Sequence, residues 1–175
     1  MSMLGKLMIP LALLSPLFIA VPAVSAAPAV TPTREIVRET ITWTLRTGQC
    51  GELPEGVSVD GTGQRHMEIV TEKRADGSTK VTVDDVVIGT AVYSNKKNAT
   101  YPFVYLNHST EVRPASGTIQ VQMQDLFVLD GRGRARLTVA FNWRWTYTPP
   151  ETQWPPRHNV QKLSTQGDPL TCDPI

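Results

Sequence analysis

The feature that most constrains the fold is an uninterrupted alternation of apolar and polar residues at 135–147 (ARLTVAFNWRWTY). Every odd-numbered residue in this segment is apolar, and the even-numbered ones are arginine, threonine or asparagine, except for Ala140. A helix would scatter the apolar residues around its circumference, whereas a strand gathers them on one side. The segment therefore predicts one long strand with a buried face and a solvated face.

Shorter runs with the same two-residue period precede this strand. Turn-forming residues separate the runs, and Asp76-Gly77 is a strong hairpin signal. Asp84-Asp85 interrupts one apolar run and predicts a bulge or a turn, with a paired-carboxylate site as the alternative. No segment has a helical stripe with caps. The runs lie at 40–46, 57–59, 65–74, 79–83, 86–93, 101–105, 119–129 and 135–147.

This pattern predicts an all-β fold, an antiparallel meander of about seven or eight strands. We expect the meander to close as a small barrel, because the hairpins follow one another in sequence and closure removes exposed edges. A two-sheet β-sandwich is the alternative.

The first 26 residues are typical of a secretory signal peptide. Lys6 precedes the almost wholly apolar stretch 7–24, and the small residues up to Ala26 form the expected cleavage site. The alternative is a membrane anchor, but prolines recur in the stretch and would interrupt a helix in lipid. We therefore expect a secreted protein with no stable membrane anchor after cleavage. The predicted organisation is a signal peptide at 1–26, a linker at 27–38, a β-barrel domain at 39–148 and a proline-rich extended tail at 149–175.

The charge of the mature chain argues against one class of partner. The whole sequence has a formal charge of +1, and Lys6 is the only charged residue of the predicted signal peptide. Cleavage therefore leaves a neutral domain of ordinary size. A neutral domain has no overall electrostatic attraction to nucleic acid or to an anionic membrane, so we predict no nucleic-acid partner.

Cys50 and Cys172 are the two cysteines of the chain. In an oxidising compartment such a pair most simply forms one intrachain disulfide, which would tie the tail to the start of the β domain. An interchain bridge or a metal-binding thiol pair are the alternatives. The three histidines, His66, His108 and His158, have no metal-ligand spacing and are interpreted as surface residues. We predict no metal and no cofactor.

Candidate ligand-binding residues come from the inward positions of the predicted strands. Asp125 falls where the alternation of Ile119, Val121 and Met123 expects an apolar residue, so it either pairs with an arginine, lines a ligand site or is turned outward by a bulge. Aromatic residues gathered on one face either fill the core or line a pocket for an apolar or sugar-like ligand. These aromatic candidates are Trp43, Trp143, Trp145 and Tyr147.

The middle of the chain resembles a group of small secreted bacterial proteins of no settled function. The resemblance rests on Cys50-Gly51, Asp76-Gly77, the segments 89–91 (GTA) and 103–107 (FVYLN), and a glycine-rich turn before the last strand. It implies a small β-barrel of the lipocalin or cyclase-barrel type and supplies no catalytic residues.

Three functions remain open. The leading hypothesis is a secreted, non-enzymatic β domain that binds a small apolar or sugar-like ligand or a cell-surface partner. The second is a secreted barrel enzyme of the cyclase or isomerase type, in which Asp125 and the Asp84-Asp85 pair polarise a substrate. The third is a structural envelope or interaction protein that uses a basic stripe on the last strand, at Arg132, Arg134, Arg136 and Arg144, together with the tail.

Overall fold

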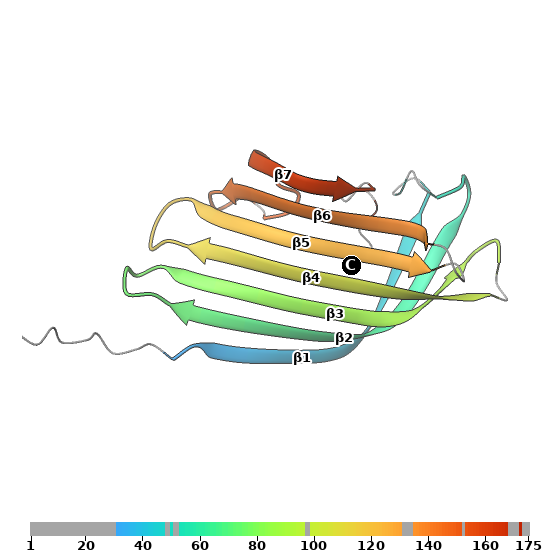
Figure 1. Ribbon diagram of the computed structural model, residues 1–175, viewed down its shortest axis with the longest axis horizontal. Coiled ribbons are helices and arrows are strands. Elements are labelled where there is room, and N and C mark those ends of the chain that lie inside the picture. The colour runs from blue at the N-terminus through green and yellow to red at the C-terminus, as the bar shows by residue number, and fades with distance from the viewer. Residues whose placement is uncertain are drawn as a thin grey trace, which may run out of the picture.

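The described part of the chain folds into one antiparallel sheet of seven strands, whose order in space is their order in sequence (Figure 1). The computed structural model describes residues 31–47, 50, 53–96, 99–130, 135–151, 153–167 and 172, and the predicted signal peptide lies outside them. The all-β meander predicted from the sequence is thereby confirmed. The strands are β1 (Thr33–Arg46), β2 (Ser58–Lys73), β3 (Thr79–Tyr93), β4 (Thr100–Arg113), β5 (Ile119–Asp130), β6 (Ala135–Tyr147) and β7 (His158–Gln166).

The pairing register gives each face of the sheet a simple numbering. From β1 to β6, odd-numbered residues stand opposite odd-numbered residues, as in the row Trp43, Gly61, Ala91 and Tyr101. Because side chains alternate between faces along a strand, all odd-numbered residues of these strands share one face. Every described residue that is buried within β1 to β6 has an odd number, so this face carries the core.

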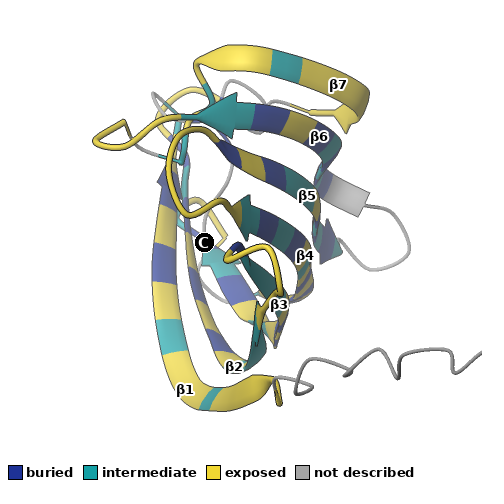
Figure 2. Cartoon of the chain, turned by 90° about the vertical axis from the view of Figure 1, so that its left-hand side faces the viewer, coloured by how far each residue is buried: buried dark blue, intermediate teal, exposed yellow. Residues whose placement is uncertain are grey.

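The sheet curls around that face but does not close (Figure 2). β1 and β7 are its two edges, and no pairing joins them in the described part of the chain. The expected barrel closure is therefore wrong, and the single sheet also excludes the two-sheet sandwich. β7 is short, almost wholly exposed, and pairs with β6 through two register shifts, so it offers no regular ladder for β1 to meet.

The two edges are joined by a covalent bond instead. Cys50 follows β1 and Cys172 follows β7, and the predicted disulfide between them is confirmed. Both cysteines are fully buried in the same apolar cluster. The disulfide thus connects the two ends of the open sheet and gives the proline-rich tail a structural role.

Glycines allow the sheet to bend sharply along β1 to β3 (Figure 1). The indole of Trp43 lies over Gly61, where a Cβ atom would overlap the ring. Gly63 stands opposite Gly89 in the next strand, and the side chain of Phe103 packs against both. These three glycines leave the space that the core aromatic residues fill.

The strand boundaries depart from the predicted ones in several places. β1 begins at Thr33, within the predicted linker 27–38, and β2 runs continuously through Gly61 and Gly63. The tail, expected to be extended only, contributes β7 as an edge strand. In the described residues, no helix is long and apolar enough to cross a membrane.

The core is divided into two apolar clusters on the concave face. The larger one gathers around Trp43, Phe103 and Phe127, and the smaller one around Phe141, Trp143 and Trp145, with Trp154 of the tail against it. Polar side chains occupy the same face between the clusters, and they form the candidate site.

Candidate functional site

A row of polar residues crosses the concave face between the two apolar clusters. Asp85 of β3, Asn107 of β4 and Asp125 of β5 stand directly opposite one another in adjacent strands. Arg65 of β2 and Tyr105 of β4 flank them on the same face. We call Arg65, Asp85, Tyr105, Asn107 and Asp125 the concave polar row.

Arg65 and Asp85 form the charged end of the row. The guanidinium donates from Nε and Nη2 to Asp85 Oδ2, at 2.8 and 2.6 Å, and Nη1 lies 3.3 Å from Glu39 Oε1. The Asp85 hydrogen bond is the main cause that raises the pKa of Arg65, against the opposing effect of its burial. The second carboxylate oxygen, Asp85 Oδ1, is buried and has no hydrogen-bond partner among the described residues. An unpaired buried acceptor is costly, so this oxygen marks where a donor is needed.

Asp125 lies at the other end of the row and is buried, with no cationic partner among the described residues. Its Oδ2 accepts hydrogen bonds from Tyr105 Oη at 2.8 Å and Asn107 Nδ2 at 3.1 Å. Burial raises the pKa of Asp125 to about 6, the two hydrogen bonds oppose this rise, and the charge of Asp85 adds to it. Asp125 therefore changes charge close to neutral pH.

An open cavity of about 300 Å³ lies against this row. Met67, Val83 and Met123 form its apolar wall. The tail contributes the remaining side, where the ring of Trp154 stacks on Phe141 with a centroid distance of 5.3 Å. The full lining is Arg65, Met67, Val83, Asp85, Tyr105, Asn107, Met123, Asp125, Gln153 and Trp154.

Of the ligand-binding residues predicted from the sequence, only Asp125 lines this cavity. Trp43, Trp143 and Trp145 lie in the apolar clusters with 7%, 1% and 2% of their surface exposed. They fill the core, which is one of the two roles predicted for them. The hydroxyl of Tyr147 donates to Glu111 Oε1 at 2.8 Å, and Arg113 also binds this carboxylate. Burial, followed by this hydrogen bond, raises the pKa of Tyr147 to about 12.

The Asp84-Asp85 pair does not form the predicted bulge. β3 runs through both residues in unbroken register, so they point to opposite faces. Asp85 joins the concave polar row, whereas Asp84 lies on the convex face with Oδ1 at 2.6 Å from His108 Nδ1. The three histidines are exposed, as predicted.

The sequence does not predict four of the residues that line the cavity: Arg65, Tyr105, Asn107 and Trp154. Arg65 had a weak signal, because it begins its run on the same side as Met67 and Ile69, where an apolar residue is expected. Trp154 had none, since its position depends on how the tail returns to the sheet.

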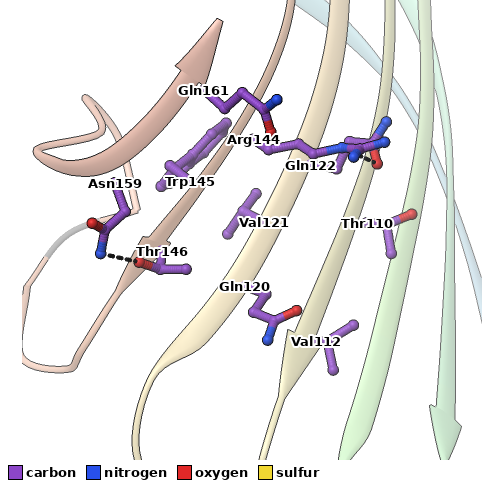
Figure 3. Close-up of a pocket in the computed structure, with 10 residues that line it drawn as sticks. All are labelled: Thr110, Val112, Gln120, Val121, Gln122, Arg144, Trp145, Thr146, Asn159 and Gln161. Atoms are coloured by element: carbon purple, nitrogen blue, oxygen red, sulfur yellow. Dashed lines mark hydrogen bonds between the residues drawn. The ribbon is translucent and has the colours of Figure 1, made fainter. Parts of the chain in front are cut away.

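A second hollow lies on the convex face, between β4 and β7 (Figure 3). Its volume is about 380 Å³, and Arg144 is the one ionisable side chain among the described residues that line it. Arg144 donates from Nε to Gln122 Oε1 at 3.1 Å, and Asn159 donates to Thr146 Oγ1 at 3.0 Å. This hollow offers amides and hydroxyls but no acidic pair. Of the predicted basic stripe, Arg132, Arg134 and the side chain of Arg136 lie outside the described residues.

No family model, curated protein or solved structure matches this chain. The described residues contain no cluster of three or more histidine, cysteine or acidic side chains that would hold a metal ion. The function is therefore argued from the concave polar row and its cavity.

The charge of Asp125 has a measurable effect on stability. Its folded-state pKa of about 6 lies above the ordinary 3.8, so its stabilising effect is complete below pH 3.8 and is lost as the pH rises through 6. Asp125→Asn keeps an oxygen acceptor for Tyr105 and Asn107 but carries no charge. We compare the free energies of unfolding of the variant and the wild type. We expect this difference to shift by about 2 kcal/mol in favour of the variant between pH 4 and pH 7.5. Urea unfolding at both pH values measures this, and a pH-independent difference would contradict it.

Proposed function

We propose that this protein is a secreted binding protein whose concave cavity takes a small, polyhydroxylated, sugar-like ligand. The observation that carries the proposal is the unpartnered Asp85 Oδ1, buried at an open cavity beside Asp125 and Asn107. A ligand hydroxyl would give this oxygen the hydrogen bond that the protein does not supply.

The chemistry of the lining favours a sugar over an apolar ligand. Carboxylates, amides and a guanidinium are planar groups that bind pairs of neighbouring hydroxyls, and the cavity presents all three kinds. Trp154 and Tyr105 add aromatic surface for the apolar face of a sugar ring. A purely apolar ligand would leave Asp85 Oδ1 buried and unpaired. The volume of about 300 Å³ is at the small end of ligand pockets, which suits one or two sugar rings.

Secretion is part of the same proposal. The signal-like segment at 1–26 and the resemblance to small secreted bacterial proteins support it, and a disulfide is stable in an oxidising compartment. N-terminal sequencing of the exported protein tests this point, and a chain that still begins at Met1 would count against it.

Calorimetric titration with a panel of monosaccharides, disaccharides and fatty acids tests the ligand class. We expect saturable binding of at least one saccharide, and no binding of fatty acids in the concave cavity. Tryptophan fluorescence of the wild type and of Trp154→Phe locates the site, because only Trp154 among the four tryptophans lines the cavity. Folded protein that binds no saccharide at millimolar concentration would overturn the proposal.

An enzyme of the cyclase or isomerase type is the second candidate. It is favoured by Asp125, whose pKa of about 6 suits proton transfer near neutral pH, with Asp85 in the same row. Conversion of a bound saccharide, followed by NMR and abolished in Asp125→Asn, would support the enzyme over the binding protein.

A further inference from the structure

The concave face is acidic, although the mature chain is predicted to be neutral. Around the cavity and the adjoining row, the odd-numbered side chains include four carboxylates, on Glu39, Asp85, Glu111 and Asp125, and two guanidinium groups, on Arg65 and Arg113. Both guanidinium groups are already paired with carboxylates of this set. β6 contributes only apolar and aromatic side chains to the described part of this face. Arg65 pairs with Asp85 and more loosely with Glu39, and Arg113 pairs with Glu111, so Asp125 is the carboxylate of this set without a cationic partner among the described residues.

We propose that the ligand in the concave cavity carries an ammonium group, which binds Asp85 Oδ1 and the carboxylate of Asp125, so that the ligand is an amino sugar rather than a neutral sugar. The inference rests on the proposed function and names its ligand class. Asp85 is 4% exposed and Asp125 is 6% exposed, so both carboxylates are screened weakly by water. A charged donor gains more from such acceptors than a hydroxyl does.

The rest of the lining suits an organic cation. The guanidinium of Arg65 is directed to Asp85 Oδ2 and to Glu39, which leaves Asp85 Oδ1 without a hydrogen-bond donor among the described residues. Trp154 and Tyr105 line the cavity, and aromatic rings attract cations to their faces. A metal ion is a poorer occupant, because the described residues offer no cluster of three ligands.

The acidic pair also makes binding depend on pH. The ionisable groups nearest to Asp125 on this face are Asp85 of β3 and Tyr105 of β4. Arg65 of β2 and Glu39 of β1 lie beyond them. The tail contributes two uncharged side chains, Gln153 and Trp154. Protonation of Asp125 removes one of the two charges that hold the ammonium group. We therefore expect affinity for an amine to fall as the pH decreases from 7 to 5, and affinity for a neutral sugar to change little.

Calorimetry at pH 7 with matched ligand pairs tests the inference in the full secreted chain. The pairs are glucosamine, galactosamine and mannosamine, each against its neutral hexose, with propylamine as an amine that has no sugar ring. We expect at least one amino sugar to bind ten-fold or more tightly than its neutral partner and than propylamine. Equal affinity within every pair would overturn the ammonium inference and leave the proposed function intact. Failure of all the saccharides to bind would overturn both.

Two variants and one control assign the preference to the acidic pair. Asp125→Asn keeps the acceptor for Tyr105 and Asn107. We expect the logarithm of the ratio between amino-sugar and neutral-sugar affinities to fall by at least half in this variant. We also expect the pH dependence of amino-sugar affinity to disappear. Asp85→Asn is expected to lose the preference entirely, provided that its circular dichroism matches the wild type. Asp84→Asn is the matched control, since Asp84 is the neighbouring aspartate on the convex face. A preference that survives in Asp125→Asn, or that disappears in Asp84→Asn, would overturn the assignment.

Discussion

Replacing both Cys50 and Cys172 by alanine is expected to lower the free energy of unfolding by about 5 kcal/mol. The disulfide closes a loop with a sequence separation of 122, and closing a loop of this length lowers the conformational entropy of the unfolded chain by the equivalent of about 5 kcal/mol. Guanidinium unfolding of the variant and of the oxidised wild type measures the difference.

The same change should release the tail before the rest of the sheet unfolds. Except for Val160, every residue of β7 is exposed, so little burial holds this strand once the covalent link is gone. Limited proteolysis is expected to cut first between residues 153 and 167, while β1 to β6 stay intact. The reduced wild type serves as the control and should behave like the double variant. An unchanged unfolding midpoint would show that the disulfide does not hold the two edges together.

Gly89→Ala is expected to destabilise the protein by about 3 kcal/mol or more, at the upper end of the cost of overpacking a core. A Cβ atom at this position would overlap the backbone carbonyl oxygen of Thr62 and lie 2.6 Å from Phe103 Cε1. Because backbone atoms of the paired strand cannot move aside, β2 and β3 would have to separate where the sheet bends. Thermal and urea unfolding measure the loss.

Thr90→Ala provides the matched control for this substitution. Thr90 is the next residue of β3 and is exposed on the convex face, where a change of this kind usually alters stability by less than about 0.5 kcal/mol. If Gly89→Ala were as stable as Thr90→Ala, the close approach of the strands would not be what requires glycine at 89. Loss of the cavity in a folded Gly89→Ala variant, seen as loss of saccharide binding, would show that the bend also shapes the site.

The strands could be predicted because their pattern is local. The alternation at 135–147 and the Asp76-Gly77 turn correctly indicate β6 and the hairpin between β2 and β3. The errors arise where polar residues or glycines fall inside a strand. The sequence predicts a bulge or a turn at Asp84-Asp85 and separates the runs 57–59 and 65–74. Both predictions are wrong because the partners of Asp85 and Gly61, Arg65 and the ring of Trp43, lie on neighbouring strands.

The candidate site could be predicted only in part from the sequence, for the same reason. Asp125 could be identified because it breaks an apolar alternation within its own strand. Asp85 and Asn107 become its neighbours only through the register of β3, β4 and β5, which is set by the length of each hairpin. Trp154 reaches the cavity because the tail folds back against the smaller apolar cluster.

The sequence by itself determined the class of fold, the inward face of most strands and the cysteine pair, since these follow from period-two patterning and from the chemistry of single residues. Only the tertiary structure decided that the sheet stays open, that a disulfide rather than hydrogen bonds joins its edges, and that two distant aspartates share one cavity. The physical reason is that edge pairing, bending and local charge depend on contacts between residues far apart in the chain. A sequence that is neutral on average thereby forms an acidic concave face.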